Sequence, residues 1–421
     1  MKTPISRDEP HIIFVDLNSA FATAEQQAHP SLRGKPVGVT NRKVTDYGCV
    51  IAVSYEGKAL GVKVGMRIDE AKLLAPNLVV LESDPPKYHH MYQKLGAIMK
   101  DYSPKVVMKS IDEGIIDLSG TRDSINKRPL LEIGREIKER VKVELGSHVR
   151  VNVGIGQNWF LAKQAASWHK PDGLDQLDHT NLVEYYKSIQ LTDLSGIAHN
   201  YEARLNSMGI MTVMQFLEAE PEFLHRRVFR SIDGLKWHRR LHGYSPDPDD
   251  VTTRLGNVGR QYVLDKRTSD DNILLPRFHY LCETTGKKLR YNNVDARGVL
   301  VWFHFDTGES WVQRKMFKST FYTDQEIYRR ALLLYNQRPK AINVASMGIT
   351  CYMLTPSSRN QQGLFDETRK AEWITQAIDE INERYGNFVI CSANSLEGKK
   401  VVKQKIPFGG TRYFELLLKR A

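Results

Sequence analysis

The sequence predicts an α+β protein that is divided into several domains. Its 421 residues are enough for about two to four separate hydrophobic cores. Within residues 11–156, apolar runs typical of strands alternate with segments of helical periodicity. A Pro- and Asp-rich stretch, HGYSPDPDDVTTR (242–254), then precedes a second region in which strands and helices alternate again. These features favour mixed domains joined by a linker.

The first region has the element order of a ferredoxin-like fold. Residues 18–86 are too many for a loop and predict an inserted subdomain, with its own strand at CVIAVS. Residues 171–185 leave the sheet pattern, so no further strand is expected there. The expected elements are strand 11–17, helix 85–104, strands 105–111 and 114–118, helix 128–146, strand 150–156 and helix 158–170.

Three carboxylates are expected to meet at one edge of this sheet. Asp16 ends the first strand, while Asp112 and Glu113 lie at the tip between the second and third strands. The acid pair on its own is equally typical of a solvated hairpin tip, and Asp16 of a strand–loop junction. Carboxylates that cluster repel one another unless a cation is present. Oxygen ligands without His or Cys favour Mg²⁺, and two such ions support phosphoryl displacement.

A helix–hairpin–helix is predicted at DLSGIAHNYEARLNSMGIMTVMQFL (193–217). Gly196, Ile197 and Ala198 form its first turn, and Ala198 stands where a second glycine is usual. Such turns present backbone N–H groups to phosphates without reading sequence. The other interpretation is a plain helical hairpin with a glycine turn.

Beyond the linker, strands are expected at GRQYVL, GVLVWFHF, SWVQRKMF and SMGITCYML. Helices are expected at LLPRFHYLCETTGKKLRYN and DQEIYRRALLLYNQ. This alternation predicts a second α+β sandwich. Basic residues such as Arg260, Arg314 and Lys315 are suited to a phosphate backbone, although charge of this kind more often marks a solvated face.

The C-terminal region contains a candidate docking peptide. QQGLFD places Leu364 and Phe365 in a polar segment, which is typical of a short peptide that binds a partner. A helix follows at EWITQAIDEINERYG, with its apolar residues along one face and Gly386 as its stop. The final basic and then apolar stretch predicts no definite element.

Composition restricts the class of protein. The formal net charge is +11 and the pI is near 9.3, which favours a polyanionic partner such as nucleic acid. No signal peptide or membrane span is apparent. The four cysteines lack metal-ligand spacing and fit a reducing, cytoplasmic setting.

Three motifs resemble one family. FVDLNSAFATAEQQAHPSLRGKPVGVT, VSYEGKALGVKVGM and KSIDEGIIDLSG, in this order, resemble the Y-family (translesion) DNA polymerases of the UmuC/DinB type. The resemblance extends over residues 10–355 and suggests a bacterial protein that is plasmid- or phage-borne. It implies a right-hand polymerase with a ferredoxin-like palm, small fingers, a helical thumb and an α+β little finger. The implied bounds are palm 1–18 and 86–176, fingers 19–85, thumb 177–244, linker 245–254, little finger 255–355 and tail 356–421.

The resemblance also implies roles for residues around the three carboxylates. Asp16, Asp112 and Glu113 would hold two Mg²⁺ ions, with Mn²⁺ as an alternative, and the backbone carbonyl of Leu17 would be a further ligand. Phe21 would be the steric gate that excludes a 2′-hydroxyl. The residues expected to hold the triphosphate are Tyr55, Lys58 and Lys170.

Some residues depart from the family pattern. Lys58 replaces a usual Arg and substitutes a point charge for a bidentate fork. Ala20 replaces a common aromatic residue, and Asn18 stands where many relatives have an acid. QQGLF (361–365) resembles a bacterial sliding-clamp-binding peptide, in which Gln361, Leu364 and Phe365 would contact the clamp.

The expected function is template-directed DNA synthesis of low fidelity past damaged bases, by a monomer that binds primer-template DNA and deoxynucleoside triphosphates. Two alternatives stay open at this point. The first is a non-catalytic DNA-binding or clamp-adaptor protein on the same scaffold. The second is a two-metal nuclease, which explains the acids but not Phe21, Tyr55 and Lys58.

Overall fold

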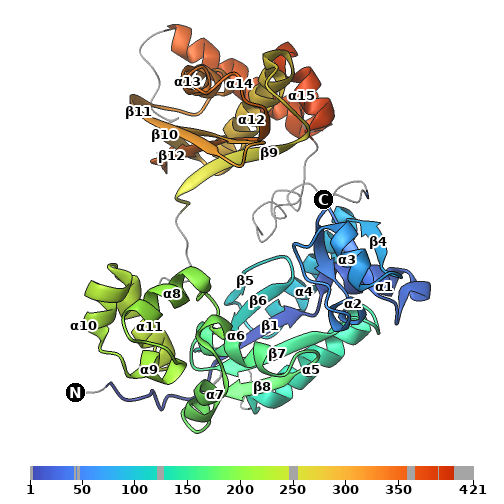
Figure 1. Ribbon diagram of the computed structural model, residues 1–421, viewed down its shortest axis with the longest axis vertical. Helices are drawn as coiled ribbons and strands as arrows, with labels where there is room; N and C mark the ends of the chain where they lie inside the picture. The colour runs from blue at the N-terminus through green and yellow to red at the C-terminus, as the bar shows by residue number, and fades with distance from the viewer. Residues whose placement is uncertain are drawn as a thin grey trace. The chain divides into compact units, whose positions relative to one another are not determined.

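The computed structural model describes residues 3–41, 44, 48–120, 128–245, 255–357, 366–386 and 388–402. These residues form two compact units, with the division between residues 252 and 253 (Figure 1). Apart from residue 245, the predicted linker lies outside the described residues. In the part of the chain that is described, no helix is both long and apolar enough to cross a membrane.

The N-terminal unit contains a five-stranded sheet, called the palm sheet below because it lies in the predicted palm, with the order β5-β6-β1-β7-β8. β1 runs antiparallel to both β6 and β7, and β6 lies between β5 and β1. This is the predicted ferredoxin-like topology, which is confirmed. The strands are β1 (Ile12–Leu17), β5 (Val106–Met108), β6 (Glu113–Asp117), β7 (Val151–Gly156) and β8 (Leu174–Leu177).

Helices cover both faces of this sheet because β1 is apolar on both sides. Ile13 and Val15 belong to the core that contains α4 (Pro85–Lys100) and α5 (Leu130–Glu144), whereas Ile12 and Phe14 pack with α6 (Trp159–Trp168). α6 approaches β7 very closely: a Cβ at Gly154 would lie 2.1 Å from the backbone of α6. Glycine is therefore required at this point of β7.

Two details of the sheet differ from the sequence-based expectation. β8 pairs in parallel with β7, so the expectation of no strand within residues 171–185 was wrong. This strand, LDQL, is short and only partly buried, and it shows no alternation that would identify it. The second difference concerns Glu113, which is the first residue of β6 rather than part of the tip. The tip is formed by residues 109–112.

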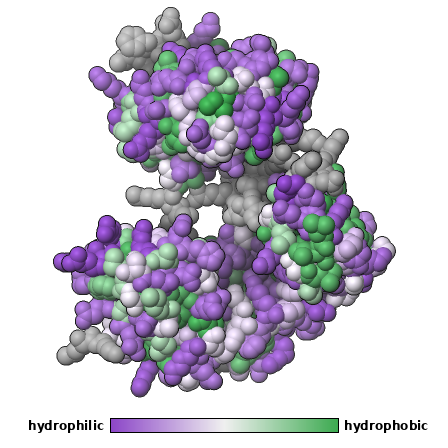
Figure 2. Space-filling view, viewed as in Figure 1, coloured by the Kyte–Doolittle hydropathy of each residue, from purple (hydrophilic) through white to green (hydrophobic). Residues whose placement is uncertain are grey.

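The inserted subdomain is built on a three-stranded sheet of order β3-β2-β4. Figure 2 shows apolar surface over this part of the molecule, where Leu60, Val64, Leu73 and Leu74 are exposed. Its elements are α1 (Ala20–Ala28), a 3₁₀ turn (Pro30–Leu32), β2 (Val37–Thr40), β3 (Val50–Val53), α2 (Tyr55–Ala59), α3 (Ile68–Leu74) and β4 (Val79–Glu82).

A helical region follows the palm sheet and has its own core, in which Phe216 and Trp237 are buried. The helix–hairpin–helix is present as α8 (His199–Ser207) and α9 (Val213–Glu218), and Gly196 before it has φ +104°, which explains the glycine. The other elements are α7 (Leu182–Ser188), a 3₁₀ turn (Leu191–Asp193), α10 (Pro221–Phe223), a π-helical turn (Leu224–Phe229) and α11 (Asp233–Leu241).

The C-terminal unit is a sheet of order β11-β10-β12-β9, with α12 and α13 packed side by side against it. All four predicted strands and both predicted helices are present, which confirms the second α+β layer structure. Their bounds are β9 (Asn257–Thr268), α12 (Asp271–Tyr291), β10 (Val294–Phe305), β11 (Ser310–Phe321), α13 (Asp324–Tyr335), β12 (Val344–Tyr352) and a short β13 (Thr355–Pro356).

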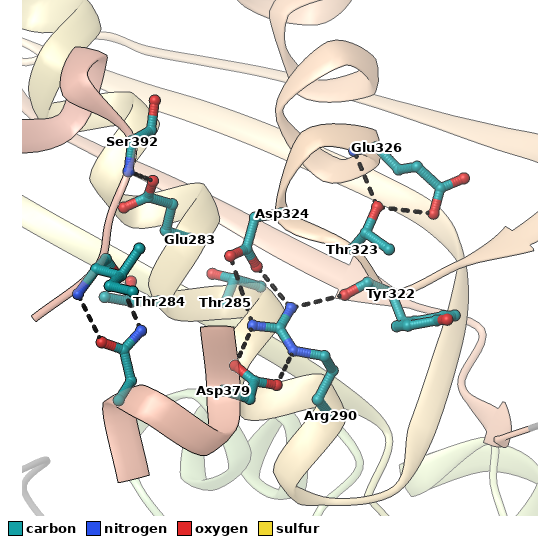
Figure 3. Close-up of polar contacts among 12 residues, drawn as sticks. Glu283, Thr284, Thr285, Arg290, Tyr322, Thr323, Asp324, Glu326, Asp379 and Ser392 are labelled. Atoms are coloured by element: carbon teal, nitrogen blue, oxygen red, sulfur yellow. Dashed lines mark hydrogen bonds and ion pairs between the residues drawn. The ribbon is translucent and has the colours of Figure 1, made fainter. Parts of the chain in front are cut away.

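A 3₁₀ turn (Ala393–Ser395) and α15 (Leu396–Val401) pack on α12, and α14 (Asp366–Tyr385) is joined to it by an ion pair. Asp379 of α14 binds the buried guanidinium of Arg290 at 2.5 and 2.9 Å, and Asp324 binds the same group at 2.6 Å (Figure 3). Buried Glu283 accepts hydrogen bonds from Ser392 N–H and the Ser395 hydroxyl. Residues 366–402 are thus an integral part of this unit, although the sequence left the last stretch unassigned.

Candidate active site

One cavity of about 380 Å³ lies between the palm sheet and the inserted subdomain. The palm sheet and the inserted subdomain both contribute to its wall, which includes residues from β1, α1, β3 and α2 and from the turn before β6. All the nucleotide- and metal-site side chains singled out in the sequence lie on this wall: Asp16, Phe21, Tyr55, Lys58, Asp112, Glu113 and Lys170.

Strand pairing brings the three carboxylates to the same end of the sheet. Asp16 and Glu113 are directly opposite each other in the antiparallel pair of β1 and β6. The N–H of Leu17 donates to the carbonyl of Asp112 at 2.8 Å, which places the residue before β6 against the end of β1. Asp16 and Asp112 are 96 positions apart in the chain, so only the topology of the sheet makes them neighbours.

The carboxylates interact with one another electrostatically. Burial raises the pKa of Asp112 above its usual value, and the negative charges of Asp16 and Glu113 act in the same direction. Ser110 partly offsets this by donating its hydroxyl hydrogen to Asp112 Oδ1 at 2.5 Å. A bound cation would relieve this repulsion and lower the free energy of the site, so the donor set fits a hard divalent metal.

Two lysines neutralise the other carboxylates. Lys170 Nζ is 2.5 Å from Asp16 Oδ2, and Lys163 Nζ is 3.0 and 2.9 Å from the two oxygens of Glu113. With these pairs in place, the described residues contain no group of three or more His, Cys, Asp or Glu side chains arranged to hold a metal ion. The carboxylates fit a metal in kind, but Asp16 and Glu113 are at present paired with ammonium groups.

Phe21 lies on a rigid aromatic support. Its ring stacks on that of Tyr88, with centroids 4.2 Å apart and planes 15° from parallel. The Tyr88 hydroxyl donates to the buried carboxylate of Glu25 at 2.8 Å, and Lys87 Nζ pairs with the other Glu25 oxygen at 2.6 Å. Because Phe21 and Glu25 are four residues apart on α1, both ends of this support are fixed to the same helix.

Tyr55 and Lys58 form the opposite wall on α2. Ser54 caps this short helix by accepting a hydrogen bond from Gly57 N–H. Burial raises the pKa of Tyr55 to about 12, and the charge of Asp16 contributes. Burial also lowers the pKa of Lys58, with a further contribution from nearby Lys170. The cavity thus holds two ammonium groups close together, Lys58 and Lys170, which suits a strongly anionic ligand.

The structure explains one departure from the family pattern. Asn18 donates from its amide to Asn152 Oδ1 at 2.7 Å and accepts from Asp172 N–H at 2.9 Å. An amide can do both, whereas a carboxylate in that place would lack the donor. Asn18 therefore fixes the loop after Lys170 against the first strand.

Sequence reasoning missed several residues of the site: Lys163, Tyr88, Glu25, Ser110 and Asn152. Lys163 lies in the predicted helix 158–170, but nothing in its spacing indicates that it contacts Glu113, 50 positions earlier. The predicted DNA-binding residues lie elsewhere, with Gly196, Ile197 and Ala198 before α8, Arg260 on β9, and Arg314 and Lys315 on β11. The predicted clamp peptide, with Gln361, Leu364 and Phe365, lies outside the described residues.

Comparison with known proteins supports a single family. Residues 15–167 match the impB/mucB/samB family, and residues 257–364 match the C-terminal domain of the same family. The chain is 32% identical to a protein named DNA polymerase IV from Moorella thermoacetica, over 93% of this chain and 97% of the relative. It is 31% identical to the DNA polymerase IV of Pelotomaculum thermopropionicum, over 94% and 97%.

The chain belongs to the Y family of DNA polymerases. Among solved structures, a Y-family DNA polymerase chimera of Dbh and Dpo4 is similar with a TM-score of 0.68 and 25% identity, over 82% of this chain and 98% of the other. The crystal structure of DinB from Sulfolobus solfataricus has a TM-score of 0.53 at 25% identity, over 82% and 99%.

Membership of the Y family confirms the predicted fold and activity. This polymerase is a DNA-directed DNA polymerase of low fidelity that carries out translesion synthesis, on a right-hand α+β scaffold. Y-family polymerases depend on divalent metal ions. The two DNA polymerase IV relatives are bacterial, which agrees with the expected origin, while a plasmid- or phage-borne gene stays a prediction.

Proposed function

We propose that Asp16, Asp112 and Glu113 are the catalytic carboxylates of this polymerase and bind two Mg²⁺ ions, with the carbonyl of Leu17 as a further ligand. The observation that carries this proposal is the register of β1 against β6, which sets Asp16 opposite Glu113 and beside Asp112 at one end of the cavity. When bound, the ions stabilise charge on the attacking and leaving oxygens of nucleotidyl transfer.

The side chains themselves supply position and charge. Strand pairing fixes the backbones of Asp16 and Glu113, so the two residues stay next to each other throughout the reaction. Ser110 holds Asp112 by a hydrogen bond, and Lys163 holds Glu113 by a contact with both oxygens. The primer 3′-hydroxyl would approach this end of the cavity, next to the carboxylates that would hold the ions.

The nucleotide would occupy the remainder of the cavity. Tyr55, Lys58 and Lys170 would bind the triphosphate, since one hydroxyl and two ammonium groups line the wall next to the carboxylates. Phe21 would lie against the sugar and exclude a 2′-hydroxyl by steric clash. Support for this role comes from the stack on Tyr88, which prevents the Phe21 ring from moving aside.

Partner contacts outside the cavity are also proposed. The turn at Gly196, Ile197 and Ala198 would bind a DNA phosphate through backbone N–H groups, and Arg260, Arg314 and Lys315 would follow the DNA backbone. Gln361, Leu364 and Phe365 would attach the monomeric enzyme to a sliding clamp. This attachment would raise the local concentration of the enzyme at the DNA, which would compensate for weak DNA binding.

Primer extension tests the catalytic assignment. The wild-type enzyme should extend a labelled primer on undamaged and lesion-bearing templates with Mg²⁺, and Asp112→Asn should abolish extension on both. Asp117→Asn, at the far end of β6, is the matched control that neutralises a carboxylate outside the cavity.

If Asp112→Asn extends primers as well as Asp117→Asn does, the catalytic assignment is wrong. Full complementation of a polymerase-deficient strain by Asp112→Asn would instead favour the adaptor alternative.

A further inference from the structure

Three lysines accompany the three carboxylates of the site. Lys58 and Lys170 line the cavity together with Asp16, Asp112 and Glu113, and Lys163 binds Glu113 from outside the cavity wall. Divalent cations therefore do not enter an unneutralised acid cluster. They must compete with cations that the protein already provides.

The two paired lysines differ in where they reach. Lys170 lines the cavity, and its Nζ is bonded to Asp16 Oδ2, so the same ammonium faces both the carboxylate and the space that the triphosphate would fill. Lys163 is not part of the cavity wall. It extends from α6 to Glu113, and its Nζ lies 5.1 Å from the centroid of the Phe14 ring, on the face of the sheet that α6 covers. Only Lys170 can exchange one anionic partner for the other.

We propose that Lys170 is an exchangeable counter-cation, bound to Asp16 in the nucleotide-free enzyme and transferred to the triphosphate when the nucleotide enters. This inference rests on the proposed nucleotide site and adds a linkage between its two kinds of ligand. Transfer of Lys170 leaves Asp16 without a neutralising partner, which raises its affinity for a divalent cation. By reciprocity, a cation on Asp16 releases Lys170 for the triphosphate.

Exposure is consistent with exchange. The side chains of Lys170 and Asp16 are 37% and 17% exposed, so the pair is partly solvated and can separate without leaving a buried charge. Lys163 and Glu113 are 26% and 20% exposed. Lys163 is therefore a matched control, because it neutralises a carboxylate of the same cluster but lies outside the space for the nucleotide.

The first experiment measures cation binding without nucleotide or DNA. Mn²⁺ is titrated into the full-length protein and free Mn²⁺ is followed by electron paramagnetic resonance. Lys170→Met should bind Mn²⁺ about tenfold more tightly than the wild type, which corresponds to about 1.4 kcal/mol. Lys170→Arg should restore wild-type affinity. Equal affinities for wild type and Lys170→Met would overturn the inference.

The second experiment isolates the exchange with a double-mutant cycle. A fluorescent dATP analogue is bound in EDTA to the wild type, Asp16→Asn, Lys170→Met and the double variant. Asp16→Asn removes negative charge in both backgrounds, but it frees an ammonium only where Lys170 is present. Asp16→Asn should therefore increase the affinity for the dATP analogue about tenfold more when Lys170 is present than when Lys170 is replaced by Met. An equal effect in both backgrounds would overturn the inference.

The same cycle with Lys163→Met in place of Lys170→Met should show no excess effect of Asp16→Asn. If the excess effect of Asp16→Asn on affinity is as large with Lys163 as with Lys170, the coupling arises from the general electrostatic field of the site and not from exchange of Lys170. That result would also overturn the inference. All these measurements are of binding. They can fail while primer extension still depends on Asp112, so failure here is distinct from failure of the proposed function.

Discussion

The two units of this polymerase use clustered charges in opposite ways. In the N-terminal unit, Asp16 and Glu113 are paired with lysines at the wall of a cavity, where water and ligands have access. In the C-terminal unit, Arg290 is only 9% exposed and is bound by Asp324 and Asp379 on two sides (Figure 3). Burial acts to lower the pKa of Arg290, but the two carboxylates outweigh it and raise that pKa.

The first cluster can exchange ion-pair partners, whereas the second stabilises the fold. A partly solvated ion pair can dissociate at a small cost in free energy, but a buried pair that loses one member leaves an uncompensated charge. Substitutions in the first cluster should therefore affect chemistry and leave stability nearly unchanged. Substitutions in the second should do the reverse.

The largest effect is expected for Glu113→Gln. Loss of one metal-binding carboxylate should lower kcat for nucleotide incorporation by about 10³-fold, equivalent to about 4 kcal/mol of transition-state stabilisation. Single-turnover kinetics would measure it. The free energy of unfolding should change by less than about 1 kcal/mol, because repulsion with Asp112 is removed as well. A large loss of stability would break the comparison between the clusters.

The converse is expected for Asp379→Asn. Arg290 would lose a charged partner in a buried place, which should destabilise the C-terminal unit by about 2 kcal/mol. Cys282 and Cys351 are fully buried in that unit, so their labelling by a thiol reagent across a denaturant series reports its unfolding. The neighbouring Glu380→Gln, on the exposed side of α14, is the control. Catalytic activity per folded molecule should stay the same.

Sugar selection should show an effect of intermediate size. Phe21→Ala should lower the preference for deoxyribonucleotides over ribonucleotides, measured as the ratio of kcat/KM values, by about tenfold. Tyr88→Leu removes the stacked support and should lower the ratio less, by about threefold, whereas Tyr88→Phe keeps the stack and should approach the wild type. An unchanged ratio in Phe21→Ala would contradict the gate assignment itself.

The smallest effect concerns the pH dependence of the C-terminal unit. Burial lowers the pKa of Lys288 to about 8, with help from Arg260. The unfolded value is about 10.4, so between these two values the unfolded chain binds more protons than the folded one. The free energy of unfolding should therefore rise with pH from about 8 to about 10.4, by about 1 kcal/mol once solvent screening is allowed for. Lys288→Met should lack this rise in the thiol-labelling assay.

Local pattern was sufficient for most of the fold. The apolar runs of β1 and β10 predicted strands, and the helical periodicity of α4, α5 and α12 predicted helices. All of these elements are present. β8 was missed because a short, partly buried edge strand has no periodic signal. The start of β6 was placed one residue too late, after Glu113. A glutamate is equally acceptable in a turn and as the first residue of a strand, so the residue type does not distinguish the two positions. Hydrogen bonding to β1 decides between them.

The sequence by itself determined the element order, the basic charge and the identity of the three acids, since these follow from periodicity, composition and short motifs. Only the tertiary structure decided which cations face those acids and what supports Phe21. Lys163, Lys170 and Tyr88 are 50, 154 and 63 positions away from their carboxylate partners in the chain. Contacts over such separations arise from strand register and helix packing, which no local pattern in the chain records.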